Sequence, residues 1–112
     1  MSRYIEVGQK KGKEDMRVIY LSGPITGTDD YMKRFAEAEY KLTKKGYTVI
    51  NPSRVNGELP QGMTHTDYMY MSFAMIDLCE EIYMMKGWQS SKGATQEWHY
   101  AEAMKKVIRE EK

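Results

Sequence analysis

The stretch "RVIYLSG" (residues 17–23) decides the fold. Val18, Ile19 and Tyr20 are β-branched or aromatic, and the run ends at a Gly-Pro pair. A short apolar run bounded by turn residues predicts a strand that is buried on both faces. Such strands are typical of parallel sheets that helices cover on each side.

The residues after this strand alternate between helical and extended patterns. Asp29 or Asp30 is expected to cap a helix over residues 31–45, in which apolar residues recur at spacings of three and four. Gly46 ends this helix, and "YTVINP" (residues 47–52) is typical of a second strand. The apolar face of the helix consists of Phe35, Ala38 and Leu42.

The middle of the chain begins with "SRVNGELPQGMTHT" (residues 53–66), which has no apolar periodicity. A loop of this length in a compact domain is usually a functional lid or a mobile segment. Asp67 is expected to cap a Met-rich helix that ends at Leu78. "EEIYMMKG" (residues 80–87) then predicts a third strand.

The last part of the chain predicts one more helix and one more strand. Ser91 is the expected N-cap of a helix to about Met104, and "KKVIREE" (residues 105–111) is a fourth short strand. Strands alternating with helices predict an α/β fold of three layers, with helices on both faces of a parallel sheet. We expect residues 1–15 to form an N-terminal arm or an extra edge strand, and residues 16–112 to form the domain.

The composition limits the classes of function. At 112 residues the chain suits one small domain, and 17 basic against 16 acidic residues give a net charge of +1, which does not suggest a nucleic-acid polymer as partner. No apolar run approaches the length of a membrane span, and no signal peptide is recognisable, so we expect a cytoplasmic protein without a membrane partner. Cys79 lies among apolar residues and is interpreted as a small core residue.

Parallel sheets bind ligands beyond the carboxyl ends of their strands. This rule brings residues 22–27, the residues from Asn51 onward and residues 87–93 to one edge of the sheet. We therefore expect the site at this edge.

The first candidate site motif is "SGPITG" (residues 22–27). Gly23 and Gly27 allow the backbone to approach a ligand closely, and the amides can form an anion cradle together with the Ser22 and Thr26 hydroxyls. The alternative is an ordinary turn between a strand and a helix. The remaining members of this candidate binding loop are Pro24 and Ile25.

The second candidate motif is "SSKGATQE" (residues 90–97). With Ser91 as N-cap, the free amides of Lys92, Gly93 and Ala94 and the helix dipole offer a site the size of a phosphate. Glu97 shares a helix face with the two small residues Gly93 and Ala94, which leave a concavity in front of it. A carboxylate at such a rim can attack a sugar carbon. The alternative is an ordinary helix carboxylate favoured by the dipole.

Aromatic and histidine residues complete the candidates. Trp88 follows a glycine at a strand end, so it is the aromatic residue expected to face a ligand, although most aromatic residues at such positions belong to the core. His65 and His99 have no third ligand at useful spacing, so we expect neither a metal site nor a cofactor.

In order along the chain, "IYLSGPITG", a helix, "GYTVINP" and "CEEIYMMKGWQSSKGATQEWHYA" resemble the small nucleoside 2-deoxyribosyltransferase-like proteins, many of them encoded by phages or prophages. The resemblance covers residues 17 to about 108. It implies a flavodoxin-like fold with a four- to five-stranded, mainly parallel sheet. It also implies a homodimer or a larger homo-oligomer.

The resemblance implies a role for Glu97. Nucleoside deoxyribosyltransferases and 2'-deoxynucleoside 5'-phosphate N-hydrolases use a helix glutamate that attacks C1' and displaces the base, and Glu97 matches it. Transferases of free nucleosides tend to carry an Asp six residues earlier, whereas the phosphate-using hydrolases carry a Ser, as this chain does at Ser91. The resemblance therefore favours a nucleoside 5'-monophosphate as the substrate.

The sequence departs from the relatives at one position. They carry an Asp that assists the leaving base, and the same count back from the third strand gives Ser72 here; the Asp that usually opens the third strand is matched by Glu80. General acid help is typically worth about 10²- to 10⁴-fold in rate. The sequence does not select a replacement among Tyr70, Asp67, His65 and Asp77.

These inferences favour an enzyme that cleaves or transfers at the N-glycosidic bond of a small (deoxy)nucleoside 5'-monophosphate. Trp88 would contact the base and residues 53–66 would close over it. A second hypothesis is a nucleotide-binding module that has lost the reaction, as a phage accessory or sensing protein. A third is an interaction protein whose Met-rich helix forms an oligomer face.

Overall fold

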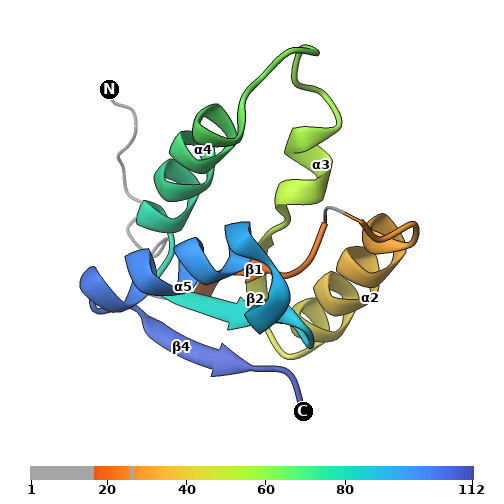
Figure 1. Ribbon diagram of the computed structural model, residues 1–112. Coiled ribbons are helices and arrows are strands. Elements are labelled where there is room, and N and C mark those ends of the chain that lie inside the picture. The colour runs from red at the N-terminus through yellow and green to blue at the C-terminus, as the bar shows by residue number, and fades with distance from the viewer. Residues whose placement is uncertain (1–16, 26) are drawn as a thin grey trace, which may run out of the picture.

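The computed structural model describes residues 17–25 and 27–112. The expectation for residues 1–15 lies outside the described residues. The chain alternates between strands and helices, as Figure 1 shows. The elements are β1 (Arg17–Ser22), α2 (Tyr31–Lys44), β2 (Tyr47–Ile50), α3 (Pro52–Asn56), α4 (His65–Asp77), β3 (Glu81–Met84), a 3₁₀ turn η1 (Trp88–Ser90), α5 (Lys92–Ala103) and β4 (Val107–Glu110).

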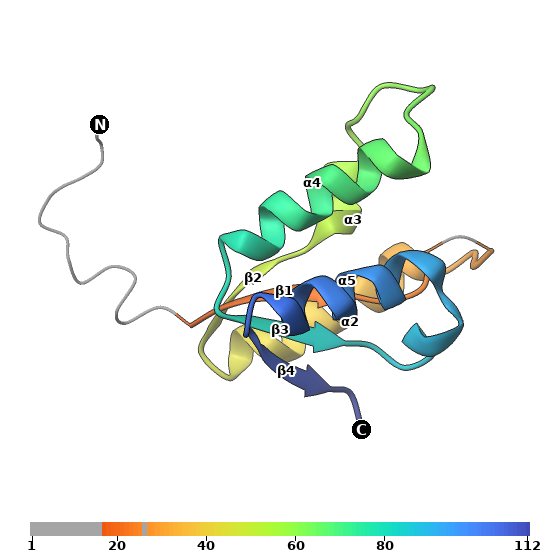
Figure 2. The ribbon, with the colours of Figure 1, turned by 60° about the vertical axis from the view of Figure 1, so that its left-hand side comes forward.

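The four strands form one parallel sheet in the order β2-β1-β3-β4. β1 is a central strand, and its Tyr20 pairs with Ile50 of β2 and Ile82 of β3. The arrows of β3 and β4 point the same way in Figures 1 and 2. The predicted α/β, flavodoxin-like fold is confirmed for the described residues, with four strands in the sheet.

The side chains of β1 alternate between two cores, one on each face of the sheet. Ile19 and Leu21 pack with residues of α2, whereas Val18 and Tyr20 pack with residues of α4 and α5. From β1 the chain crosses to β2, at one edge of the sheet, and from β3 it crosses to β4, at the other edge. Because the two crossovers run in opposite directions and both are right-handed, their helices α2 and α5 lie on opposite faces of the sheet. The α2 core contains Phe35, Ala38 and Leu42, and the other core contains Ile76, Cys79, Ala94 and Ala101.

Part of the segment predicted as a loop is a helix. α3 lies inside residues 53–66 except for its first residue, Pro52, and Asn51 is its N-cap, whose side chain accepts a hydrogen bond from the Ser53 amide. Proline in the first turn suits a helix start because it has no amide hydrogen to leave unpaired. A helix of 5 residues is too short to show apolar periodicity, so the prediction was wrong for these residues.

Two predicted helix starts need correction. α4 begins after Thr64, whose side chain accepts a hydrogen bond from the Asp67 amide, while the Asp67 carboxylate accepts one from the Thr64 amide. Asp67 is therefore the fourth residue of a capping box and not the N-cap. Asp30 is the N-cap of α2, but its side chain makes no capping hydrogen bond.

The amino ends of the strands are closed by a buried carboxylate, Glu81. The Tyr47 hydroxyl donates to Glu81 Oε1 at 2.8 Å, and Arg109 Nε donates to the same oxygen at 3.0 Å. Burial acts to raise the pKa of Glu81, but the hydrogen bonds from Tyr47 and Arg109 outweigh it, and the pKa is lowered. This charge is paired within the fold, so we look for chemistry at the opposite end of the sheet.

Candidate active site

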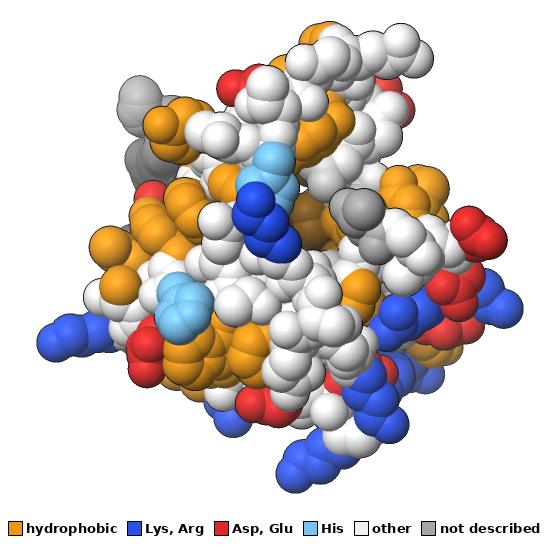
Figure 3. All heavy atoms as spheres, in the orientation of Figure 1, with side chains coloured by type: hydrophobic (Ala, Val, Ile, Leu, Met, Phe, Trp, Pro, Cys, Tyr) orange, Lys and Arg blue, Asp and Glu red, His pale blue; other side chains and the backbone are white. Residues whose placement is uncertain are grey.

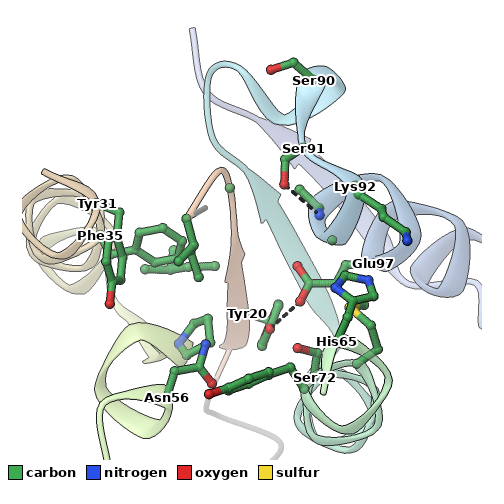
Figure 4. A pocket seen from close by; sticks show the side chains of 18 residues that line it. Tyr20, Tyr31, Phe35, Asn56, His65, Ser72, Ser90, Ser91, Lys92 and Glu97 are labelled. Atoms are coloured by element: carbon green, nitrogen blue, oxygen red, sulfur yellow. Dashed lines mark hydrogen bonds between the residues drawn. The ribbon is translucent and has the colours of Figure 1, made fainter. Parts of the chain in front are cut away.

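A cavity of about 690 Å³ lies at the carboxyl end of β1. Figure 3 shows a hollow with a histidine and a basic side chain at its rim. Tyr31 and Phe35 of α2 lie across the cavity from His65, Lys92 and Glu97 (Figure 4). The volume is in the range of small-molecule sites.

Glu97 is held at the inner end of this cavity by two hydroxyls from β1. The Tyr20 hydroxyl donates to Oε2 at 2.8 Å, and the Ser22 hydroxyl donates to Oε1 at 2.6 Å. Tyr20 and Ser22 are two residues apart on a strand, so both point to the same face of the sheet. Glu97 is only 8% exposed, yet each of its oxygens has a donor (Figure 4 draws the bond to Tyr20).

Burial and hydrogen bonding act against each other on the Glu97 charge. Burial raises the pKa of Glu97, while the Ser22, Tyr20 and Ser72 hydroxyls and the nearby His65 act to lower it, and the net pKa is raised. Burial, followed by the Glu97 charge, raises the pKa of Tyr20 well above its ordinary value, so Tyr20 stays a protonated donor. The hydrogen bonds thus offset only part of the cost of burying this carboxylate, and a pKa shifted by burial and by specific partners in a cavity is typical of catalytic groups.

The first turn of α5 lines the same cavity. Ser91 is the N-cap, as predicted, and its hydroxyl accepts a hydrogen bond from the Ala94 amide at 3.1 Å. The Ala94 amide is therefore not free for a ligand, which corrects the expectation of three free amides. The amides of Lys92 and Gly93 have no partner inside a helix at these positions, and the Lys92 side chain also lines the cavity.

Six of the predicted site residues line the cavity: Gly23, Ile25, Ser91, Gly93, Ala94 and Glu97. Ser22 is not a lining residue, but its hydroxyl donates a hydrogen bond to Glu97, which does line the cavity. Pro24 and Gly27 are not among the lining residues, and Thr26 lies outside the described residues.

The glycines of "SGPITG" have local structural causes. A Cβ on Gly23 would lie 2.9 Å from the Cβ of Met85, which is too close for any other residue. Gly27 is exposed and has a φ of +82°, a conformation that favours glycine. The reading of these residues as an ordinary strand-to-helix turn therefore explains both glycines.

Trp88 does not face the cavity, which corrects the prediction for this residue. Its ring stacks on Trp98 of α5, with centroids 5.9 Å apart and planes at 9°, and it packs against the core shared by α4 and α5. Trp88 begins the 3₁₀ turn η1, and Gly87 immediately before it has a left-handed backbone conformation with a φ of +89°. Trp88 is a packing residue, as most aromatic residues at strand ends are.

Several lining residues were not singled out from the sequence. Tyr20 is indistinguishable from its apolar neighbours in a buried strand until the sheet shows which face it occupies. Asn56 belongs to the short helix that carries no periodicity. Lys92 was noted for its amide alone. The others are Leu21, Tyr31, Phe35, Pro52, Met69 and Ser90.

The described residues contain no group of three or more His, Cys, Asp or Glu side chains placed to hold a metal ion. Within the same part of the chain, no helix is long and apolar enough to cross a membrane. The residues that line the cavity offer a ligand hydroxyls, amides, the Lys92 ammonium and the His65 imidazole.

Comparison with known families matches residues 17–110 to the family described as "Domain of unknown function (DUF4406)". The chain belongs to this family. The match includes β1, α5 and every described residue that lines the cavity.

Among solved structures, the chain is similar to a 2-desoxiribosyltransferase from Leishmania mexicana, with a TM-score of 0.63 and 18% identity. The match covers 84% of this chain and 63% of the transferase, so the chain spans less than two thirds of that protein. The likeness shows the deoxyribosyltransferase-like fold. No curated protein matches the chain.

Glu97→Gln is predicted to raise the thermal unfolding temperature increasingly as the pH rises. Because burial raises the pKa of Glu97, the folded protein binds this proton more tightly than the unfolded chain. That contribution to stability is fully present below the ordinary value of 4.5 and is lost as the pH rises through the raised value. Gln does not ionise, so the Glu97→Gln variant keeps this contribution to stability at every pH. Thermal unfolding of both proteins from about pH 4 to about pH 8 measures the difference.

Glu102→Gln is the control for the loss of one negative charge, because Glu102 is exposed on the same helix. A gain for Glu97→Gln that is the same at both ends of the pH range would contradict the prediction.

Proposed function

We propose that this chain cleaves the N-glycosidic bond of a (deoxy)nucleoside 5'-monophosphate, with Glu97 as the nucleophile. The observation that carries the proposal is the buried Glu97 carboxylate, held by Tyr20 and Ser22 beside a cavity of ligand size. The deoxyribosyltransferase-like fold supports it, as does the resemblance of the motif from Ser91 to Glu97.

The reaction proceeds in two displacements. A Glu97 oxygen attacks C1', the C1'–N bond breaks, and its electron pair leaves with the base, which takes up a proton. Water or a second base then attacks C1' of the glycosyl ester, loses a proton and releases the Glu97 carboxylate. Two displacements at one carbon retain its configuration, as in retaining glycosidases.

The hydrogen bonds from β1 prepare Glu97 for this attack. They fix the carboxylate in one orientation, and they favour its ionised form against burial. A nucleophile that is oriented before the substrate arrives avoids much of the entropic cost of the reaction.

The start of α5 suits a phosphate. The Lys92 and Gly93 amides, the positive end of the helix dipole and the Lys92 ammonium provide donors and positive charge at one side of the cavity. Ser91 adds no negative charge there. A Cβ on Gly93 would lie 3.8 Å from Met69 Sδ, so the fold itself has room at this position, and the glycine leaves space for a ligand.

The remaining parts of the proposal concern the surroundings of the chain. We propose a cytoplasmic protein of the small, phage-type group that forms a homodimer or a larger homo-oligomer. The outer surface of α4 and the residue after it expose Tyr70 by 70% and Leu78 by 59%, and such apolar surface suits contact with a second copy.

Glu97→Gln is predicted to lower the release of free base by at least about 10³-fold, because the variant lacks the nucleophile. The test incubates the protein with each of the four deoxynucleoside 5'-monophosphates and separates free base by chromatography. Glu102→Gln, on the exposed face of the same helix, keeps the activity of the original chain. Equal base release by the original chain and Glu97→Gln would reject the enzyme proposal.

Ser91→Asp is predicted to reverse the preference between a nucleoside 5'-monophosphate and the free nucleoside. Asp is as good an N-cap as Ser, so α5 keeps its cap, but its carboxylate repels the phosphate and can accept a hydrogen bond from a 5'-hydroxyl. We expect kcat/KM for the monophosphate to fall about 10²-fold while that for the nucleoside is kept or rises. A parallel fall for both substrates would contradict a phosphate at this position.

The second candidate function is a nucleotide-binding module without turnover. The observation that favours it is Ser72, a buried hydroxyl that lines the cavity where the enzymes it resembles carry a carboxylic acid. Tight binding of a monophosphate in calorimetry, with no base released, would favour this module over the enzyme. The absence of binding by any nucleotide would reject both functions.

A further inference from the structure

The proposed reaction needs a proton donor for the leaving base, and Ser72 is not an acid. The described residues that line the cavity include six titratable side chains, and one of them is an imidazole, the side chain that ordinarily exchanges a proton near neutral pH. The six are Tyr20, Tyr31, His65, Tyr68, Lys92 and Glu97.

The other candidates near Ser72 are engaged elsewhere. The Asp67 carboxylate accepts a hydrogen bond from the Thr64 amide in the capping box. The Asp77 carboxylate accepts one from the Tyr100 hydroxyl at 2.7 Å, at the far end of α4. Tyr70 is 70% exposed and does not line the cavity. His65 is the one of the four candidates that lines it.

The helix places His65 on the same face as Ser72. His65 is the first residue of α4, and Ser72 follows seven residues later, which is about two turns of an α-helix. Both side chains therefore face α5, and both line the cavity. A Cβ on Gly93 would lie 3.9 Å from Cε1 of His65, so the ring lies over the first turn of α5 (Figure 4).

A hydrogen bond to Gln96 fixes which nitrogen of the ring is free. His65 Nε2 lies 2.7 Å from Gln96 Oε1, and an amide oxygen only accepts, so Nε2 carries a hydrogen. No hydrogen bond from the described residues occupies Nδ1. Nδ1 is thus the atom at which the ring can give or take a proton, and His65 is an exposed residue.

We infer that His65 is the general acid that protonates the leaving base, with Gln96 holding its ring in place. The inference rests on the proposed function. As Glu97 bonds to C1' and the C1'–N bond breaks, the proton on Nδ1 passes to the base, and His65 becomes neutral with its hydrogen on Nε2. In the second displacement, neutral Nδ1 takes a proton from the attacking water or base, which restores the imidazolium.

The charged groups that face the ring suit this cycle. Glu97 faces it from α5, and the attraction between the imidazolium and the carboxylate favours the state in which the nucleophile is ionised and the acid is protonated. Lys92, also on α5, lies at the rim of the same cavity, where a bound phosphate neutralises its charge. The proposed cycle uses Glu97 as the ionised nucleophile and His65 as the protonated acid, a division of roles between two neighbouring titratable groups that is common in active sites.

The test compares substrates that differ in their need for an acid. 2'-Deoxyguanosine 5'-monophosphate needs a proton to release its base, whereas its N7-methyl derivative already carries the positive charge and releases a neutral base. For a chain that accepts only pyrimidines, deoxyuridine monophosphate and its 5-nitro derivative form the corresponding pair. His65→Ala is expected to slow the unmodified substrate about 10²- to 10⁴-fold and the activated substrate less than about 10-fold. His99→Ala, which removes the other histidine of the chain, leaves both rates unchanged.

The outcomes separate this inference from the proposed function. If His65→Ala slows both substrates equally, or slows neither, His65 is not the acid although the enzyme proposal stands. If the original chain releases base from no substrate, the proposed function fails and this inference fails with it. Circular dichroism and thermal unfolding check that His65→Ala is folded; if it is not, His65→Gln is tested with the same expected result, because Gln fills similar space without donating an acidic proton.

Discussion

The structure depends on a buried carboxylate and the strand that holds it. An ionised side chain removed from water is costly unless donors replace the water, and Tyr20 and Ser22 provide one donor for each oxygen of Glu97. Both donors lie on the central strand, whose alternate residues Ile19 and Leu21 form the core on the other face. A shift of β1 by one residue would move each of its core side chains to the opposite face of the sheet and remove both donors from Glu97, so the register and the site are fixed together.

This arrangement links stability and function. The hydroxyls that hold Glu97 do not fully compensate for its burial, because the pKa of Glu97 stays raised. The chain therefore accepts a stability cost at a position where an apolar or neutral residue would be more favourable. Such costs are typical of functional sites, where the group is kept for what it does to a ligand.

The sequence predicts the fold and part of the site, for identifiable reasons. The apolar run of β1 and the helical spacing of Phe35, Ala38 and Leu42 predict the layers, and Ser91 predicts the start of α5. These signals are local. The role of Tyr20 is not local, because it depends on which face of β1 meets α5. The short helix α3 has too few residues for a periodic signal, so only the structure shows that it contributes to the cavity.

Trp88 and the glycines of "SGPITG" illustrate the opposite limit. An aromatic residue at a strand end can contact a ligand or, more often, the core, and only geometry separates the two for a given residue. Trp88 turns away to Trp98, and Gly23 is required by Met85. By contrast, the sequence does not distinguish His65 from Tyr70, Asp67 and Asp77, and its place on the Glu97 side of the cavity follows from the first turn of α4, where the capping box starts the helix.

A crystal structure of Glu97→Gln with a bound deoxynucleoside 5'-monophosphate tests the central claim most directly. The account predicts that C1' of the sugar lies within about 3–3.5 Å of the side-chain oxygen at position 97, with the phosphate on the amides of Lys92 and Gly93. A nucleotide bound elsewhere on the molecule, or one in the cavity with its sugar turned away from position 97, would contradict it.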